Sequence, residues 1–155
     1  MIWKEPPAIK VYEALGAIGD KRLEIEGNTA KVYSSSGNKF YEVTYDPQAN
    51  AITSNDNGSF YQGYLGYPMI AFLLVRGTII HDTTWDEALK GFPWKDINVR
   101  FKNDWEKTAS FIREELKKRE YSLVDFDAEL EHIMGQIRAL QLKHLPSGTK
   151  PPTAY

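Results

Sequence analysis

Hydrophobic positions near the start of the chain change from helical to strand spacing. Apolar residues step by three or four from Ile9 to Ile18, which predicts a short helix that Gly19 ends. After this point apolar and polar positions alternate in short runs separated by turn-forming residues, as is typical of strands. The runs cover residues 23–26, 30–33, 40–45 and, as the candidate for a fourth strand, 51–53. This order predicts a helix followed by an antiparallel meander of three to four strands.

The rest of the chain has helical spacing. Residues 69–75 are apolar on every side, as expected of a helix buried against a sheet. Thr84 and Glu87 have capping-box spacing and predict a brief helix. No Gly or Pro interrupts the apolar spacing of residues 96–119, and a final helical pattern runs from residue 126 to 144. Because the link between these two is short, we expect a C-terminal antiparallel helical hairpin.

Length and composition fit a single domain. A chain of 155 residues with 42% hydrophobic and 26% charged residues can bury a core without further staples. The fold class is therefore predicted as α+β, with one domain over residues 1–145, of which 84–145 form the helical part. Residues 146–155 contain three prolines and little apolar bulk, so we expect a flexible tail.

The absence of cysteine restricts the chemistry. It excludes disulfides, iron–sulfur clusters, thiolate zinc sites and a thiol nucleophile. The first residues lack the apolar stretch of a secretory signal, so we expect a cytoplasmic protein. The apolar run at 69–75 is far shorter than the roughly 20 residues that cross a bilayer, so we expect no membrane association. The net charge of −2 argues against a surface that neutralises many phosphates.

The order of motifs between residues 8 and 77 is distinctive. A Ser/Gly turn at 34–38 precedes a Y-x-V strand at 41–43, and a polar loop begins at Ser54. Residues 66–74 then combine a Gly-Tyr-Pro entry with an apolar helix. In this layout the region resembles the SWIM zinc-finger domain, in the form whose short helix precedes the meander. In that family a C-x-C pair and a later C-x-H pair bind zinc, the second pair opening a buried helix.

The zinc ligands of the SWIM family are missing here. By the resemblance, Met69 takes the cysteine position and Ala71 the histidine position of the C-x-H pair, while the loop that starts at Ser54 stands where the C-x-C pair would lie. The resemblance therefore implies a metal-free relative without cofactor, in which packing replaces the folding energy of zinc. We expect apolar and aromatic side chains to fill the vacated volume, namely those of Met69, Phe60, Tyr61 and Tyr64.

Three other arrangements carry weaker signals of chemistry. Glu129 and His132 have the E-x-x-H spacing of ferritin-like metal sites, but the preceding helix has no histidine, so a solvated helix face is favoured. His81 and Asp82 could form a base with its orienting carboxylate, yet no nucleophile has a matching context. The loop at 55–58 resembles part of a calcium site without its obligatory carboxylates. We expect no catalytic residues and no metal ligands.

Aromatic residues are concentrated in one third of the chain. Together with lysines on adjoining strands, they could bind a partner or stack on bases. The candidate interaction surface comprises Lys31, Lys39, Tyr41, Tyr61, Tyr64 and Tyr67.

The leading functional hypothesis is a non-catalytic protein-interaction module, in line with the protein association that the SWIM resemblance implies. The C-terminal helices are a second candidate surface, for self-association, if Met134 and Leu142 extend their apolar side. The alternative is a weak single-stranded nucleic-acid-binding protein that uses Lys31, Lys39, Tyr41 and Tyr61.

Overall fold

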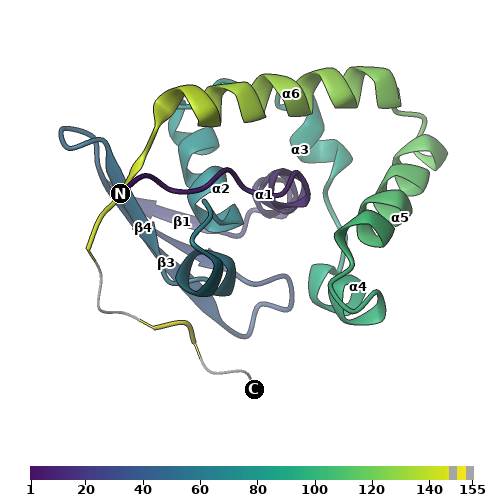
Figure 1. Ribbon diagram of the computed structural model, residues 1–155. Helices are drawn as coiled ribbons and strands as arrows, with labels where there is room; N and C mark the ends of the chain where they lie inside the picture. The colour runs from purple at the N-terminus through teal and green to yellow at the C-terminus, as the bar shows by residue number, and fades with distance from the viewer. Residues whose placement is uncertain (147–149, 153–155) are drawn as a thin grey trace.

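The computed structural model describes residues 1–146 and 150–152, and the predicted tail at 146–155 lies mostly outside them. Within the described residues a sheet carries helices on one face (Figure 1). Side chains on the opposite face of β2 and β3 are mostly polar and exposed. This arrangement confirms the predicted α+β class, with its N-terminal helix, antiparallel meander, buried helix and C-terminal helices. In these same residues no helix is both long enough and apolar enough to cross a bilayer.

The sheet has the predicted meander and one additional strand. Its neighbouring strands follow chain order: β1 (Leu23–Glu26), β2 (Thr29–Tyr33), β3 (Phe40–Asp46), β4 (Ala51–Ser54) and β5 (Lys143–His144). The first four are antiparallel, whereas β5 pairs with β4 in parallel. Val32 opposite Tyr41 and Ala30 opposite Val43 lie on the buried face. Because side chains alternate along a strand, Lys31 lies on the opposite, polar face.

Two helices form the interior beside the sheet. Helix α1 (Ile9–Gly19) packs on α2 (Tyr67–Arg76), and α2 contacts β3 and β4. Pro68 near the start of α2 and a left-handed Gly77 after its end fix the bounds that the sequence predicts. Met69 and Ala71, the positions compared with zinc ligands, are fully buried in apolar surroundings. Gly16 of α1 is required by close approach, because a Cβ there would collide with the Trp94 indole.

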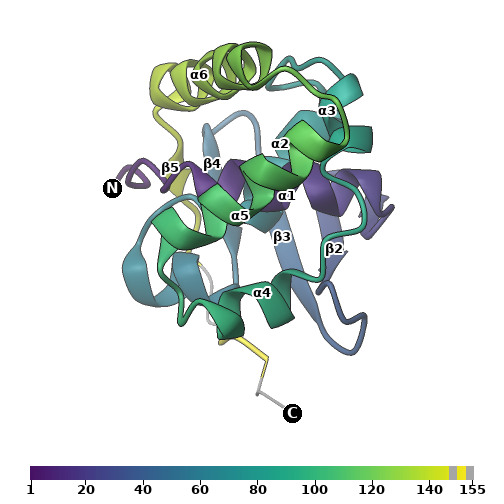
Figure 2. The same ribbon diagram turned by 90° about the vertical axis from the view of Figure 1, so that its right-hand side faces the viewer.

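The remaining helices pack around α1 (Figure 2). They are α3 (Thr84–Ala88), α4 (Trp94–Arg100), α5 (Trp105–Lys118) and α6 (Leu123–Leu140). Helices α5 and α6 diverge from the short turn that joins them. One hydrophobic core extends from Ile9 to Leu142, so the meander and the helical part share their interior.

The prediction of one helix over residues 96–119 is wrong. Helix α4 ends at Arg100, and Lys102 and Asn103 adopt left-handed φ angles of 54° and 59°. Asp104 then caps α5 by accepting a hydrogen bond from the Lys107 backbone N at 3.2 Å. A cap of this kind competes with continued helix, which is why the break needs neither Gly nor Pro.

The extension of the last helix to His144 is also wrong. Gln141 turns into the left-handed region at φ 47°, and His144 joins the sheet in β5. Backbone hydrogen bonds to β4 and to the N-terminal segment replace those of the helix. The predicted capping box is wrong too. The N-cap position of α3 is Thr83, which makes no side-chain cap hydrogen bond, and the Thr84 backbone N donates instead to Asp82 Oδ1 at 2.9 Å.

Candidate functional site

A cleft of about 650 Å³ opens between the meander and the helical part. Its walls come from α1, the turn before β3, the short π-helical turn η1 (Gly58–Gln62), the start of α2, and α4 with the loop that follows it. Among its described lining residues, the charged side chains are Lys10, Glu13, Arg22, Lys39, Asp56 and Lys95, Asn98 adds an amide from α4, and the large aromatic side chains are Tyr41, Tyr61, Tyr64, Tyr67, Trp94 and Trp105. The cleft is therefore a polar and aromatic surface set into an apolar fold.

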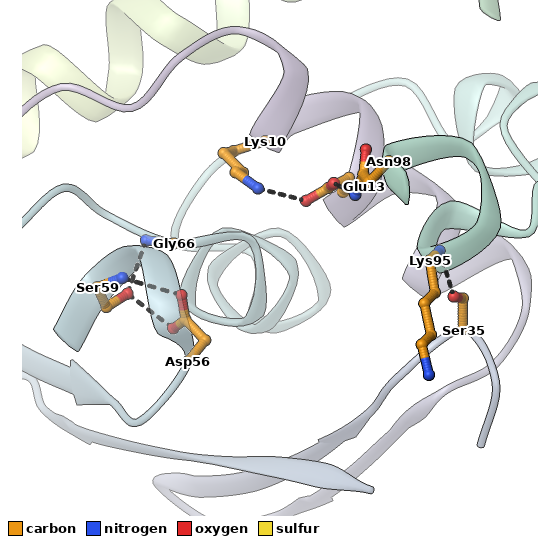
Figure 3. Close-up of polar contacts among 8 residues, drawn as sticks. All are labelled: Lys10, Glu13, Ser35, Asp56, Ser59, Gly66, Lys95 and Asn98. Atoms are coloured by element: carbon orange, nitrogen blue, oxygen red, sulfur yellow. Dashed lines mark hydrogen bonds and ion pairs between the residues drawn. The ribbon is translucent and has the colours of Figure 1, made fainter. Parts of the chain in front are cut away.

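A buried ion pair lies on the α1 wall. Lys10 Nζ is 3.1 Å from Glu13 Oε2, one helical turn away, and Asn98 Nδ2 of α4 donates to Glu13 Oε1 at 3.0 Å (Figure 3). Only 3% of Glu13 is exposed, and the Lys10 ammonium also lies 4.5 Å from the centroid of the Trp105 ring. The hydrogen bond from Asn98 to Glu13 thus joins α4 to the ion pair on α1.

Electrostatics keep Lys10 charged. Burial by itself lowers the pKa of Lys10, but Glu13 foremost, and then Tyr64 and Asp56, act in the opposite direction, and the resulting pKa is above its ordinary value. Burial raises the pKa of Tyr64 despite the nearby Lys10 ammonium. At neutral pH the cleft therefore presents a protonated amine beside a protonated phenol.

The η1 wall is fixed by a second network. Asp56 accepts hydrogen bonds from the Ser59 backbone N at 3.0 Å and from Ser59 Oγ at 2.7 Å. Ser59 Oγ in turn accepts from the Gly66 backbone N at 3.1 Å (Figure 3). This network holds η1 against the start of α2, and a side chain at Gly66 would overlap both Asp56 and Ser59.

Arg22 forms the wall on the meander side. Its Nη1 donates to the Tyr33 carbonyl at 2.7 Å, and its Nε lies 3.5 Å from Asp20 Oδ2. Its Nη2 is buried and has no hydrogen-bond partner within the described residues. Burial strongly raises the pKa of the neighbouring Tyr67, and the Arg22 guanidinium offsets only part of this effect.

Side chains from the turn and from η1 continue this wall toward solvent. Tyr67 packs edge-on against Tyr41 with ring centroids 6.2 Å apart, and Lys39 Nζ lies 5.6 Å from the centroid of the Tyr41 ring. Tyr61 is 68% exposed. On the α4 side, the Lys95 backbone N donates to Ser35 Oγ at 3.1 Å (Figure 3). The rim is thus aromatic and cationic.

The structure brings five of the six predicted surface residues together. They are Lys39, Tyr41, Tyr61, Tyr64 and Tyr67, all of which line the cleft. Lys31 lies outside it, on the polar face of the sheet, with its Nζ 4.9 Å from the centroid of the Phe40 ring. Phe60 and Tyr61 are both exposed, so the expectation that they fill an interior volume is wrong, whereas Met69 is fully buried.

Sequence reasoning missed the acid–base part of the cleft. Lys10 and Glu13 are the only charged residues between positions 9 and 19, in an otherwise apolar helix, and this isolation was the available signal. Nothing in the local pattern around Arg22 or Asn98 marks either residue. Their role follows from the packing of α4 against α1 and the meander.

The other candidate residues have structural partners. His81 Nε2 is 2.9 Å from Asp86 Oδ1, so His81 pairs with Asp86 and not with Asp82. Glu129 accepts from the Asp82 backbone N at 2.6 Å and lies 3.4 Å from His132 Nδ1. Asp82, Glu129 and His132 line a second depression of about 630 Å³, whereas the His81–Asp86 pair is not among its described lining residues. Across residues 1–146 and 150–152, no group of three or more His, Asp and Glu side chains is arranged to bind a metal.

The proposed apolar side of the last helix is occupied. Met134 and Leu142 are both buried in the core of their own chain. They are therefore not available to a second chain, which corrects the expectation that self-association uses them.

Comparison with known proteins identifies a family. The model described as Uncharacterised conserved protein UCP014422 matches residues 3–143, and the chain belongs to this family. No curated protein and no solved structure gives a significant match. The matched region contains all the described residues that line the cleft. The SWIM resemblance rests on layout alone and stays a prediction.

Proposed function

We propose that this protein is a non-catalytic binding domain whose cleft holds a small molecule. The observation that carries the proposal is the cleft itself, a hollow of about 650 Å³ whose buried Lys10–Glu13 pair is fixed from two helices. Ligand sites in proteins generally measure about 300–1,000 Å³ and combine aromatic lining with a few well-placed polar groups. The cleft has this size and this composition.

The state of its polar groups favours binding over covalent chemistry. Lys10 has a raised pKa, so its amine is protonated at neutral pH and lacks the lone pair that a nucleophile needs. Both carboxylate oxygens of Glu13 already have partners, Lys10 and Asn98. Groups that are held in this way are suited to orienting a ligand.

A fragment screen by protein-observed NMR tests the proposal. We expect hits to shift amide signals of α1, η1 and α4, and Tyr61→Ala to weaken them, because Tyr61 lines the cleft. Phe60→Ala is the matched control, since Phe60 is an exposed aromatic residue of the same turn that does not line the cleft. Hits that cluster elsewhere, with both variants binding like the wild type, would refute the proposal.

A protein-interaction module is the second candidate, and exposed apolar side chains beside the cleft favour it. Phe60, Tyr61 and Val99 are exposed, with the first two in edge-to-face contact at 4.9 Å between centroids. A protein partner that covers this rim would contact both aromatic residues, whereas a small ligand inside the cleft needs Tyr61. Equal loss of binding in Phe60→Ala and Tyr61→Ala therefore favours a protein partner.

The geometry gives less support to single-stranded nucleic acid. Stacking requires exposed rings beside cations on one surface. Here Tyr41 is buried on the inner face and Lys31 lies on the outer one. Titration with a short oligonucleotide at low salt, comparing Lys31→Ala with Lys39→Ala, tests this alternative, which requires both variants to weaken binding.

A further inference from the structure

The most exposed side chains of the cleft are uncharged. Five of its described lining residues are exposed, and they are Asn57, Tyr61, Gln62, Val99 and Asn103. Three of them carry amides, one a phenol and one an alkyl group. They come from two sides of the cleft, since the first three belong to η1 and the residue before it and the last two to α4 and the loop after it. The accessible part of the lining therefore offers hydrogen bonds and apolar contact without net charge.

The carboxylates of the lining have partners within the fold. Glu13 is bound to Lys10 at 3.1 Å and to Asn98 at 3.0 Å. Asp56 accepts two hydrogen bonds from Ser59, and both carboxylates are buried. Taking a partner away from a buried charge is costly. A cationic ligand therefore gains little from either carboxylate.

The cations of the lining are engaged as well. Arg22 lies 3.5 Å from Asp20 Oδ2 and donates to the Tyr33 carbonyl at 2.7 Å. Its Nη2 atom has no partner among the described residues but is itself buried, so a ligand in the cleft does not reach it. Lys39 and Lys95 add positive charge to the rim, but both are half-buried and both have partners. Among the described lining residues, an anionic ligand thus meets cations that already interact with the protein.

The exposed ring and amides together suit a sugar. Tyr61 is 68% exposed and supplies an aromatic surface, against which the C–H groups of a sugar ring can pack. Hydroxyl groups around the edge of such a ring both donate and accept hydrogen bonds, as side-chain amides do. Gln62 lies on the η1 side and Asn103 on the α4 side. Because the hydroxyl groups point outward in several directions, one ring can bond to both sides.

We propose, building on the small-molecule role above, that the cleft binds an uncharged sugar whose ring packs on Tyr61 and whose hydroxyl groups bond to the amides of Gln62 and Asn103. The engaged charges of the walls disfavour a charged ligand. The exposed amides favour a hydroxyl-rich ring over a purely apolar one. Since these contacts carry no net charge, the affinity should not depend on salt.

NMR titration with matched probes tests the class of ligand. The neutral probes are glucose, galactose and mannose, each compared with its uronic acid and its amino sugar. Indole is a neutral ring without hydroxyl groups. We expect at least one neutral sugar to shift amide signals of η1 and α4, with an affinity that added salt leaves unchanged. Its uronic acid and its amino sugar should bind no more tightly.

Variants of exposed residues locate the sugar without disturbing the core. Tyr61→Ala should weaken sugar binding about three- to tenfold, the scale of one aromatic contact. Gln62→Ala and Asn103→Ala should each weaken it by a similar factor, the scale of one neutral hydrogen bond, and leave indole unchanged. Gln48→Ala removes an exposed amide that is outside the described lining of the cleft, and it should change neither probe.

The outcomes separate this inference from the proposed function. If indole shifts the cleft amides and no neutral sugar does so up to its solubility limit, the sugar inference is overturned and the small-molecule cleft stands. The same holds if a uronic acid or amino sugar binds in the cleft over about tenfold more tightly than its neutral parent and salt removes the difference.

Two further results also overturn the sugar inference. One is a sugar that binds all three variants, Tyr61→Ala, Gln62→Ala and Asn103→Ala, as tightly as the wild type, which places it outside the cleft. The other is the absence of any cleft shift with both the sugars and indole. In either case the small-molecule cleft depends on the fragment screen alone.

Discussion

Trp3 and His144 stack face to face, with ring centroids 3.5 Å apart and planes inclined by 13°. Trp3 Nε1 also donates to the Ile52 carbonyl at 2.8 Å, and the His144 backbone N donates to the Met1 carbonyl at 2.8 Å. This pair therefore fastens the N-terminal segment and β5 to β4.

Trp3→Ala tests the energetic weight of this contact. Because the ring is only partly buried, we expect the free energy of unfolding to fall by about 2–3 kcal/mol, below the usual cost for a core tryptophan. Urea denaturation measures the change. Val124→Ala, at a position 80% exposed, is the control and should change stability by less than about 0.5 kcal/mol.

His144 should make the protein less stable in acid. Burial, and then the N-terminal amine, lower the pKa of His144, so the unfolded chain takes up a proton at a higher pH than the folded chain. The stability that His144 contributes is present above its ordinary pKa of about 6.5 and is lost as pH falls through the lowered folded pKa. Unfolding curves of wild type and His144→Gln between about pH 5 and pH 7 should diverge, with the variant less sensitive. Parallel curves would contradict this.

His81 should act with the opposite sign. Its hydrogen bond to Asp86 raises the pKa of His81, against the lowering effect of burial. The folded chain therefore holds the proton to a higher pH than the unfolded chain, so this stabilisation is complete below about pH 6.5 and is lost as pH rises through the folded pKa. Comparing Asp86→Asn with wild type should show the stability difference shrinking as the pH rises from about 6 to 8. A difference that grows would refute the assignment.

The Lys10–Glu13 pair should be costly to break from one side. Glu13→Gln leaves the buried Lys10 charge without its partner, and we expect a loss of about 3 kcal/mol. The double variant Lys10→Met with Glu13→Gln removes both charges and should recover much of this loss. Thermal and urea unfolding of the wild type, of Lys10→Met and Glu13→Gln singly, and of the double variant measure the coupling, and simple additivity of the two substitutions would show that the pair is not coupled.

Gly66 should not tolerate a side chain. Its backbone is extended, so the cost of Gly66→Ala comes from overlap with Asp56 and Ser59 and should be about 2 kcal/mol. Gly135→Ala is the matched control in the interior of α6, where the nearest atom lies 3.8 Å from the added Cβ. That substitution should raise stability by about 0.5–1 kcal/mol, because alanine favours helix. Urea unfolding curves test both expectations, because Gly66→Ala should lower the free energy of unfolding and Gly135→Ala should raise it.

The elements with strong periodicity were predictable from the sequence. The meander and α2 follow from alternation, turn residues and the Pro68 to Gly77 limits, all of which act over a few residues. The break at Lys102 and Asn103 was not predictable in this way, since neither residue is a helix breaker and the cap at Asp104 decides it. Strand β5 depends on pairing with β4, a partner remote in the sequence, which no local pattern reveals.

Only the aromatic part of the candidate site was predictable from the sequence. Its tyrosines stood out by their density, and the structure places Tyr41, Tyr61, Tyr64 and Tyr67 at one cleft. Lys10 and Arg22 were hidden, because they come from different parts of the chain and line the same cleft only in the folded protein. Residues whose role depends on tertiary packing have no periodicity of their own.

The shared construction of the cleft has a consequence for motion. Helix α4 meets the rest of the wall through the Asn98–Glu13 and Lys95–Ser35 hydrogen bonds. Anything that fills the space beneath this short helix resists its detachment, so occupancy should slow hydrogen exchange in α4 more than in α2. Local opening of this one short helix would then report a bound ligand without a change in the overall fold.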